Sequence, residues 1–276
     1  MSSEQEIQFL QWALPRLGYR WEGFRKPRQQ VLKRIRERMQ ELALTGGYPA
    51  YREYLERNPE EWARLDRMCD VTISSFFRDR GVWDFMRDTL LPDLLTRNRN
   101  VPFRAWSAGC CNGEEAYSLA IIVRQLAANI EAISTTDALI IASDRNPAVM
   151  ERARKGRYPR GALNELKQGE IDRFFLPVDT PEEDYQVRDP LKRMVRFERR
   201  DIAKSIPDTV FDLIMCRNLV FTYFSKERQH EFLNRLDPRL KAGGFLVVGS
   251  HEKLPETDGI SLYNRTHPIY QKQKKS

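Results

Sequence analysis

Residues 103–120 read FRAWSAGCCNGEEAYSLA, and this stretch decides the fold. The apolar run FRAWSA predicts a buried strand, the segment at Gly109 predicts a tight turn, and residues 114–127 predict a helix. The same order of elements recurs further along the chain. Strands that alternate with helices indicate βαβ units, which build a parallel sheet with helices on both faces.

Four further apolar runs predict strands, at 138–143, 195–198, 211–216 and 244–249. Helices are predicted between them at 147–156 and 226–241. The segment from 172 to 197 is richer in proline and acidic residues, and we expect an inserted loop or hairpin there.

Residues 4–70 have a helical pattern throughout. In VLKRIRERMQEL (31–42), the apolar residues recur at spacings of three and four, which predicts one buried stripe on a helix. Gly46-Gly47 is expected to end this helix, and 48–55 and 59–69 predict two more. We therefore expect a small helical domain ahead of the sheet.

The composition is that of a soluble globular protein. Of the 276 residues, 41% are hydrophobic and 31% are charged, which excludes a disordered or fibrous chain. No apolar run approaches the roughly 20 residues that cross a bilayer. The start, MSSEQEIQFLQW, lacks the basic and apolar regions of a signal peptide, so we expect a cytoplasmic protein.

The cysteines and histidines do not form a metal-binding pattern. The four cysteines show no C-x-x-C spacing, and the three histidines, His230, His251 and His267, are scattered near the C-terminus. We expect neither a metal site nor a disulfide framework.

The net charge of +7 is concentrated in one segment. Residues 16–38 hold nine Lys or Arg against only Glu22 and Glu37. A localised basic surface predicts an acidic partner, which could be nucleic acid, anionic lipid or an acidic protein. The alternative is a solvated helix face without a partner.

Polar residues follow three of the predicted strands, at the edge where open parallel sheets bind ligands. The turn at 109–113 is neither a dinucleotide fingerprint nor a P-loop, and the acidic pair Glu114-Glu115 suits a ligand that carries positive charge. Asp144 could bind ribose hydroxyls or cap the next helix. The pair Arg217-Asn218 ends a buried strand, with Tyr223 shortly after. Together these features predict a nucleoside site for S-adenosylmethionine.

Several stretches resemble the chemotaxis-receptor glutamate methyltransferase family, the CheR type. They are Ser75–Asp79, WSAGCCNGEEAYSLA (106–120), ASDRN (142–146), ARKGRY (153–158), FDLIMCRN (211–218) and Gly243-Gly244. In addition, RIRERM (34–39) falls where that family has a basic, helical N-terminal domain.

The resemblance implies an α/β fold, a class I methyltransferase (Rossmann-like) sheet domain over 73–276 behind an all-helical domain over 1–72. Residues 172–197 would then form a small inserted β-hairpin subdomain. The implied reaction transfers a methyl group from S-adenosylmethionine to protein glutamate side chains, with S-adenosylhomocysteine as the product. The implied partner is an acidic helical protein, the cytoplasmic region of a chemoreceptor. We expect a monomer that binds no nucleic acid and does not insert into a membrane.

The resemblance also implies the site residues. The cofactor-binding positions are Thr72, Ser74, Arg78, Glu115, Asp144, Asp201, Ile202, Arg217 and Asn218. Asp144 would hold the ribose, Glu115 the methionine end, and Asp201-Ile202 would lie near the adenine. The implied catalytic residues are Arg78, which would hold a carboxylate in two-point contact, and Tyr223, which would donate a hydrogen bond. The spacing from Asn218 to Tyr223 is one residue longer than is usual in the family.

Three alternative functions stay open. A nucleic-acid methyltransferase would fit the basic segment, but the Asn/Asp-Pro-Pro-Tyr motif of amino-methylating enzymes is absent after the strand at 211–216. A non-catalytic S-adenosylmethionine-binding module would fit the altered spacing before Tyr223. A methyltransferase of the same fold could also act on a small carboxylate or another protein.

Overall fold

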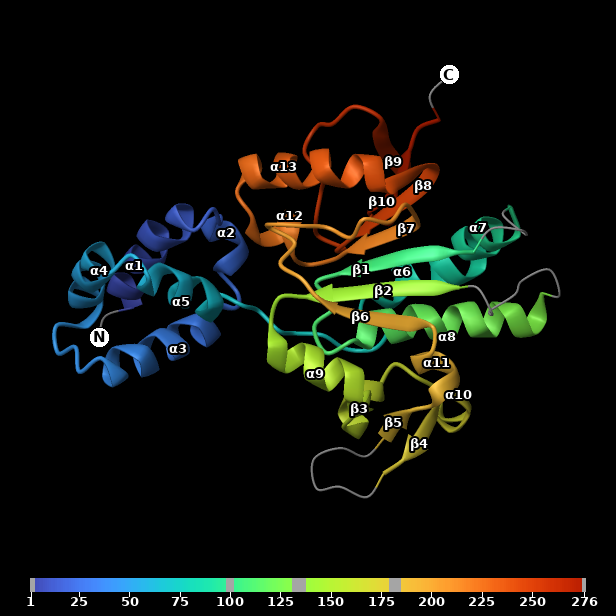
Figure 1. Cartoon of the computed structure of the whole chain (residues 1–276), viewed down its shortest axis with the longest axis horizontal. Helices are drawn as coiled ribbons and strands as arrows, with labels where there is room; N and C mark the ends of the chain where they lie inside the picture. The colour runs from blue at the N-terminus through green and yellow to red at the C-terminus, as the bar shows by residue number, and fades with distance from the viewer. Residues whose placement is uncertain (1–2, 98–101, 131–137, 179–184, 275–276) are drawn as a thin grey trace. The chain divides into compact units, whose positions relative to one another are not determined.

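A computed structural model describes residues 3–97, 102–130, 138–178 and 185–274 of the chain. The chain divides into two compact units (Figure 1). The helical unit comprises residues 1–71 together with 220–229, and the sheet unit comprises residues 72–219 and 230–276. Residues 220–229 thus group with the N-terminal helices, although they follow a strand of the sheet in the chain.

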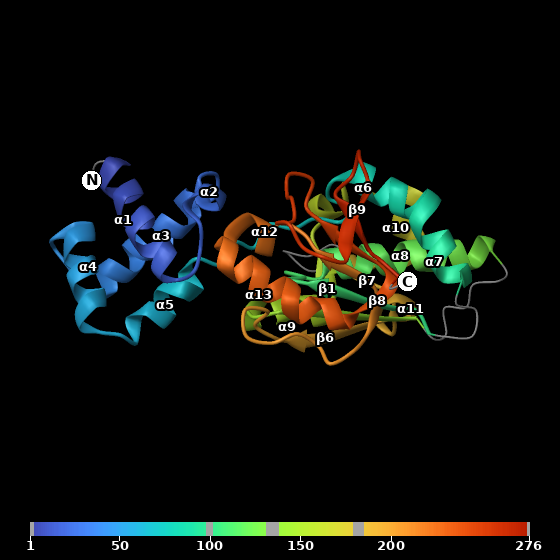
Figure 2. The ribbon, with the colours of Figure 1, turned by 90° about the horizontal axis from the view of Figure 1, so that it is seen from above.

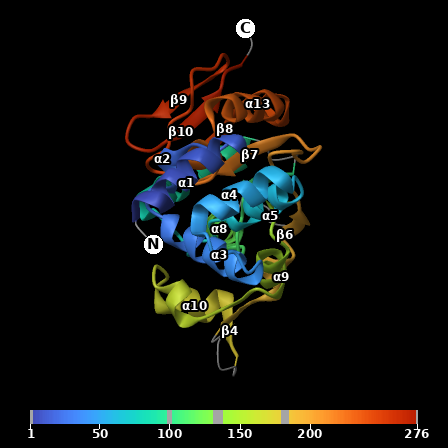
Figure 3. The ribbon, with the colours of Figure 1, turned by 90° about the vertical axis from the view of Figure 1, so that its left-hand side faces the viewer.

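Among its described residues the helical unit contains six whole helices, and α1 to α5 are labelled in Figure 3. They are α1 (Ser3–Arg16), α2 (Trp21–Phe24), α3 (Arg28–Glu41), α4 (Gly47–Arg57), α5 (Glu61–Met68) and α12 (Val220–Tyr223). The apolar stripe of α3 is buried as predicted, with Leu32, Ile35 and Met39 in the core. The predicted end of this helix was wrong. It stops at Glu41, because Ala43 takes a left-handed φ of 53°, and Gly47 begins α4 instead.

The sheet unit contains a seven-stranded sheet in the order β6-β2-β1-β7-β8-β10-β9. Its strands are β1 (Arg104–Ala108), β2 (Leu139–Asp144), β6 (Val195–Arg199), β7 (Phe211–Cys216), β8 (Leu240–Val248), β9 (Ile260–Asn264) and β10 (Ile269–Lys272). Strands β6, β2, β1, β7 and β8 are parallel to one another, whereas β10 is antiparallel to both of its neighbours, β8 and β9. The predicted α/β class with a mostly parallel sheet is confirmed.

Helices cover both faces of the sheet, as Figure 2 shows. One face packs against α6 (Arg80–Phe85), η1 (Met86–Leu90), α7 (Leu91–Arg97) and α8 (Glu114–Asn129). On the other face, Trp106 of β1 lies 5.9 Å from the Phe211 ring and 6.3 Å from the Phe232 ring of α13 (Lys226–Leu236). Helix α9 (Pro147–Lys155) packs beside β2 and β6.

The C-terminal part of the sheet differs from the prediction. The predicted helix to residue 241 ends at Leu236, because Pro238 lies in a short 3-10 turn, Asp237–Arg239, and β8 begins at Leu240. Strands β9 and β10 were not predicted. Most of β9 is exposed, so it lacks the apolar run that indicates a buried strand.

The predicted insertion contributes two strands to a second, three-stranded sheet, and the third strand, β3, precedes the predicted start at 172. Its antiparallel strands lie in the order β3-β5-β4, with β3 at Arg157–Tyr158, β4 at Phe175–Pro177 and β5 at Tyr185–Val187. Short helices flank these strands: η2 (Arg160–Leu163), α10 (Gln168–Phe174) and α11 (Asp189–Lys192). Residues 179–184 of the predicted hairpin lie outside the described residues. Residues 195–197 belong to β6 of the main sheet, so the predicted boundary at 197 was too late.

Candidate functional site

The carboxyl ends of the parallel strands meet along one edge of the main sheet. Strand β1 lies between β2 and β7, which is where the strand order reverses, and open α/β sheets bind ligands at this point. The amides of Gly109 and Cys110 both donate to the Ser143 carbonyl, at 2.8 and 2.9 Å. The turn after β1 therefore lies against the end of β2.

Asp144, at the end of β2, fastens this turn. Its Oδ2 accepts a hydrogen bond from the Cys111 amide at 3.1 Å, and its Oδ1 accepts one from the Asn146 amide at 2.9 Å. The alternative role as a helix cap is wrong, because Asn146 is the residue that caps α9, by accepting from the Ala148 amide at 3.0 Å. Asp144 is thus a half-buried carboxylate held at the switch point of the sheet.

Glu115 lies at the start of α8 beside the end of β1. Its Oε1 accepts a hydrogen bond from the Ser107 hydroxyl at 2.7 Å, and its Oε2 lies 3.5 Å from Nη1 of Arg217. Burial raises the pKa of Glu115, and the Arg217 charge opposes this rise. The carboxylate is therefore half-buried and paired with Arg217.

Arg217 joins three of the predicted site segments. Its side chain is only 3% exposed, and its Nη2 contacts the Asp79 carboxylate at 2.8 Å and the Arg78 carbonyl at 2.7 Å. Its Nη1 faces Glu115, and its guanidinium lies over the Trp83 ring at 5.5 Å. The residue following β7 thus ties the turn after β1 to the segment before α6.

The segment before α6 contains Thr72, Ser74 and Arg78, all half-buried. Burial raises the pKa of the Glu114 carboxyl, and hydrogen bonds that include one from Ser74 oppose this rise. The Arg78 guanidinium donates to the Ile73 carbonyl at 2.8 Å. Asp79 pairs with Arg217 at 2.8 Å.

Backbone strain is concentrated at the same edge. Among the described residues, five non-glycine residues have left-handed φ angles, and four of them lie in the site segments: Phe77, Asp79, Cys111 and Asn218. Such conformations persist only where the surroundings impose them, and they cluster at functional sites. The strain supports this edge as the functional one.

Glu252 holds the turn that follows β7. Its carboxylate is buried and accepts three backbone hydrogen bonds, from Asn218 at 2.8 Å, Leu219 at 3.1 Å and Gly249 at 2.6 Å. Asn218 keeps its left-handed φ of 55° because the Glu252 carboxylate binds the backbone of Asn218 and Leu219. Glu252, Ser107 and Asp79 contact the candidate site residues but were not predicted from the sequence. Each is a polar residue beside an apolar run, and that is the signal that was available.

Asp201 and Ile202 follow β6. The Asp201 Oδ1 accepts a hydrogen bond from the Ala203 amide at 3.0 Å, and Ile202 is buried. The Arg200 amide donates to the Asp144 carbonyl at 3.0 Å. This loop is therefore attached to the end of β2, where the nucleoside is predicted.

Tyr223, the other predicted catalytic residue, belongs to the helical unit. Its ring lies 4.9 Å from that of Phe24, and its carbonyl accepts a hydrogen bond from the Arg20 amide at 2.8 Å. The other nine predicted residues belong to the sheet unit.

The unpartnered polar atoms provide a test of the predicted cofactor. Among the described residues, buried side-chain atoms without a hydrogen-bond partner include two acceptors and one donor at this edge: Asn112 Oδ1, Glu114 Oε2 and Arg217 Nε. Buried polar groups are normally paired, so these atoms point to a ligand with both kinds of group. The methionine end of S-adenosylmethionine has an ammonium donor and a carboxylate acceptor, and it fits this set.

The comparison with known protein families agrees with the geometry. Residues 72–268 match the CheR methyltransferase SAM-binding domain. This chain belongs to the CheR methyltransferase family. S-adenosylmethionine is the cofactor of this domain.

Several relatives cover most of the chain. A chemotaxis protein methyltransferase of Listeria monocytogenes is 32% identical over 223 residues, covering 79% of this chain and 80% of that protein. A probable chemotaxis protein methyltransferase of Rhizobium etli is 31% identical over 251 residues, covering 86% and 91%. A chemotaxis protein methyltransferase of Escherichia coli is 32% identical over 233 residues, covering 82% and 76%.

Both cysteines of the turn after β1 are buried. Burial raises the pKa of the Cys111 thiol to about 12 and also raises that of Cys110. Since the thiolate is the nucleophilic form, burial disfavours reaction at both thiols. No group of three or more potential metal ligands occurs among the residues that the structure describes.

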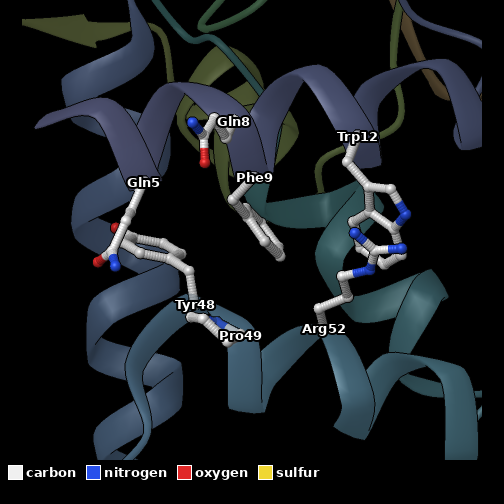
Figure 4. A pocket seen from close by; sticks show the side chains of 7 residues that line it. All are labelled: Gln5, Gln8, Phe9, Trp12, Tyr48, Pro49 and Arg52. Atoms are coloured by element: carbon white, nitrogen blue, oxygen red, sulfur yellow. The ribbon is translucent and has the colours of Figure 1, made fainter. Parts of the chain in front are cut away.

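A separate hollow of about 210 Å³ lies in the helical unit, between α1 and α4 (Figure 4). Its lining residues are Gln5, Gln8, Phe9, Trp12, Tyr48, Pro49 and Arg52. The Arg52 guanidinium lies 4.5 Å from the Trp12 ring, and burial raises the pKa of Tyr48 to about 12. None of the predicted site residues lines this hollow.

The basic segment at 16–38 is largely used to build the helical unit. Arg34 donates to the Met68 carbonyl at 2.9 Å, Arg36 pairs with Glu6 at 2.8 Å, and Arg38 pairs with the buried Glu61 at 2.9 Å. Three of the nine basic residues of this segment are therefore paired within the helical unit. Arg25 and Lys26 are exposed.

Across the described part of the chain, no helix is both long and apolar enough to cross a lipid bilayer.

Proposed function

We propose that this chain transfers the methyl group of S-adenosylmethionine to glutamate side chains of a chemoreceptor. One observation carries this proposal. The buried Arg217 joins Glu115 at the turn after β1 to the segment that contains Ser74 and Arg78. The curated relatives are named chemotaxis protein methyltransferases, which supports the same reaction.

The predicted residues would hold the cofactor along the carboxyl edge of the sheet. Asp144 would accept hydrogen bonds from the ribose, and Asp201 and Ile202 would contact the adenine. Glu115, Arg217 and the unpartnered atoms of Asn112 and Glu114 would contact the methionine end. When bound, S-adenosylmethionine supplies an electrophilic methyl group.

The acceptor requires no general base. A glutamate side chain has an ordinary pKa of about 4.3, so it is already an ionised nucleophile at neutral pH. The protein has to orient this carboxylate and exclude water from it. Arg78 suits the first task, because a guanidinium holds a carboxylate by two parallel hydrogen bonds. Tyr223 would donate a further hydrogen bond.

The exposed part of the basic segment would attract the substrate. Arg25, Lys26 and Lys33 are exposed, although Lys33 also lies 3.9 Å from Glu37. Complementary charge speeds encounter with an acidic helix more than it tightens the final complex.

The test is incubation with labelled S-adenosylmethionine and cytoplasmic fragments of chemoreceptors. We expect the label in the fragment, and its release as methanol by mild base would identify a carboxyl ester. Cofactor binding without transfer to any fragment would favour a non-catalytic module instead. Label that resists mild base would indicate an amine or another acceptor.

A further inference from the structure

Helix α12 follows β7 in the chain but is held by the helical unit. The structure groups residues 220–229 with the N-terminal helices. An antiparallel bridge pairs Tyr19 with Phe224, and the Ser225 amide donates to the Gly18 carbonyl at 2.9 Å. The two residues that follow Tyr223 are therefore fastened to Gly18 and Tyr19, between α1 and α2.

Arg20 makes the central contacts to this helix. Its Nε donates to the Thr222 carbonyl at 2.8 Å, and its Nη2 donates to the Phe221 carbonyl at 2.7 Å. Its backbone amide donates to the Tyr223 carbonyl at 2.8 Å. The last carbonyls of a helix have no partner within the helix, and α12 has only four residues. Arg20 therefore satisfies the carbonyls that α12 itself cannot.

Gly23 and Phe24 complete the contact. A Cβ atom at Gly23 would lie 2.2 Å from the Thr222 carbonyl oxygen and 3.1 Å from Cδ1 of Tyr223, so only glycine permits this approach. The Phe24 ring packs against the Tyr223 ring with 4.9 Å between centroids. Both the backbone and the ring of Tyr223 are thus in contact with residues 20–24.

We propose that Arg20 is a positioning residue for Tyr223, and that the helical unit sets the place of this side chain. The inference rests on the proposed function, in which Tyr223 donates a hydrogen bond to the methyl acceptor. Arg20, one cation of the basic segment, would then hold α12 in place and would not attract the substrate.

The test is Arg20→Lys, which keeps the charge but cannot donate in two fixed directions. We expect amide hydrogen exchange of residues 219–225 to become about tenfold faster, the scale of one lost charge-assisted hydrogen bond. We also expect kcat to fall about tenfold, with the substrate KM and the affinity for S-adenosylhomocysteine changed less than about twofold. Gly23→Ala, which displaces α12 without changing charge, should give the same pattern.

A matched control is Arg52→Lys in α4. Arg52 belongs to the same unit but contacts Trp12 and Glu56, so exchange in 219–225 and kcat should stay unchanged. A second control combines Arg20→Lys with Tyr223→Phe. If Arg20 acts through Tyr223, its replacement should lower kcat little further in the absence of the tyrosine hydroxyl.

Two results would overturn the inference while the wild-type enzyme remains active. One is unchanged exchange or unchanged kcat in Arg20→Lys. The other is a raised substrate KM at constant kcat, which would make Arg20 a substrate-attracting charge. Failure of the proposed function has a different signature, because the wild type itself would then transfer no methyl group to any receptor fragment.

Discussion

The buried guanidinium of Arg217 lies 2.8 Å from the carboxylate of Asp79, although 138 residues separate them in the chain. Asp79 takes a left-handed φ of 62° immediately before α6. Because Arg217 also faces Glu115, one side chain links the end of β7, the start of α8 and the segment before α6. The candidate site is therefore assembled around a buried cation.

Replacement of this cation should loosen the site. In Arg217→Lys, an ammonium cannot serve Asp79, the Arg78 carbonyl and Glu115 in their present directions. We expect the affinity for S-adenosylhomocysteine to fall on the order of tenfold or more, because contacts to buried charges are lost. Calorimetry would measure this. The exposed Arg199→Lys at the end of β6 is the control and should bind normally. Equal affinities in the two variants would contradict this role of Arg217.

Asp144→Ala tests the ribose contact. Loss of charge-assisted hydrogen bonds should lower cofactor affinity on the order of tenfold or more. Asn146→Ala is a close control, because Asn146 caps α9 two residues away. It should cost about 1 kcal/mol of stability and leave affinity unchanged. If the two variants bind S-adenosylhomocysteine equally well, Asp144 does not hold the ribose.

The helical unit should lose stability in acid through Glu61. Burial alone would raise the pKa of Glu61, but hydrogen bonds from Arg38 and Tyr51 outweigh it and hold the pKa below the ordinary value of 4.5. A carboxyl with a lowered pKa in the folded state stabilises the fold above its unfolded pKa and loses that contribution as pH falls through the folded value. We therefore expect the unfolding free energy to drop as pH falls below about 4.5.

Glu61→Gln should remove this pH dependence and cost about 2 kcal/mol at neutral pH. Denaturant titrations followed by the fluorescence of tryptophans in the helical unit would show both effects. Glu56→Gln is the control, because Glu56 is exposed and its pairing with Arg52 is worth less than about 1 kcal/mol. An acid transition that persists in Glu61→Gln would assign it to another group.

The strands of the main sheet could be predicted because their burial dictates their composition. The predicted run at 211–216 matches β7 residue for residue, and all six of its residues are buried. Strand β9 was not predicted, since its sequence ISLYN is short and interrupted by a serine, and most of its side chains face solvent. The periodicity of apolar residues indicates which face of an element is buried, and it gives no signal for an element that is mostly exposed.

The position of the candidate residues at the strand ends could be predicted, but the contacts between them could not. Asp144 and Arg217 follow apolar runs, and that position in a parallel sheet is sufficient to nominate them. The pairing of Arg217 with Asp79 depends on how distant segments pack, which local sequence does not encode. The same limit explains why Arg38 was taken for a surface charge although it pairs with the buried Glu61.

Exposed cations of the helical unit should affect the substrate and not the cofactor. Arg25→Glu with Lys26→Glu should raise the KM of the receptor fragment several-fold and leave the affinity for S-adenosylhomocysteine unchanged. In the wild type, KM should rise with salt, because charges are screened beyond about 8 Å at physiological ionic strength. The control is Arg57→Glu, which makes the same charge reversal at an exposed position on α4 and should leave KM unchanged. A KM that does not respond to salt would mean that this surface attracts no acidic partner.

The last prediction concerns the absence of a catalytic base. If the acceptor is an ionised carboxylate, no group that titrates near pH 7 is required. His230 and His251 are exposed, and the His267 ring packs 5.6 Å from that of Phe85, so replacement of each histidine by Gln should leave kcat nearly unchanged. Arg78→Lys should instead lower kcat about a hundredfold, the scale of roughly 2.7 kcal/mol, because an ammonium cannot grip a carboxylate at two points.

Both results are needed from one assay with receptor fragments. A histidine variant that binds S-adenosylhomocysteine but transfers no methyl group would indicate an acceptor that has to be deprotonated, such as an amine or a hydroxyl. Arg78→Lys with full activity would show that the acceptor carboxylate is held elsewhere. Only inactive Arg78→Lys together with active histidine variants agrees with a glutamate nucleophile, because that acceptor needs orientation and has no proton to lose at neutral pH.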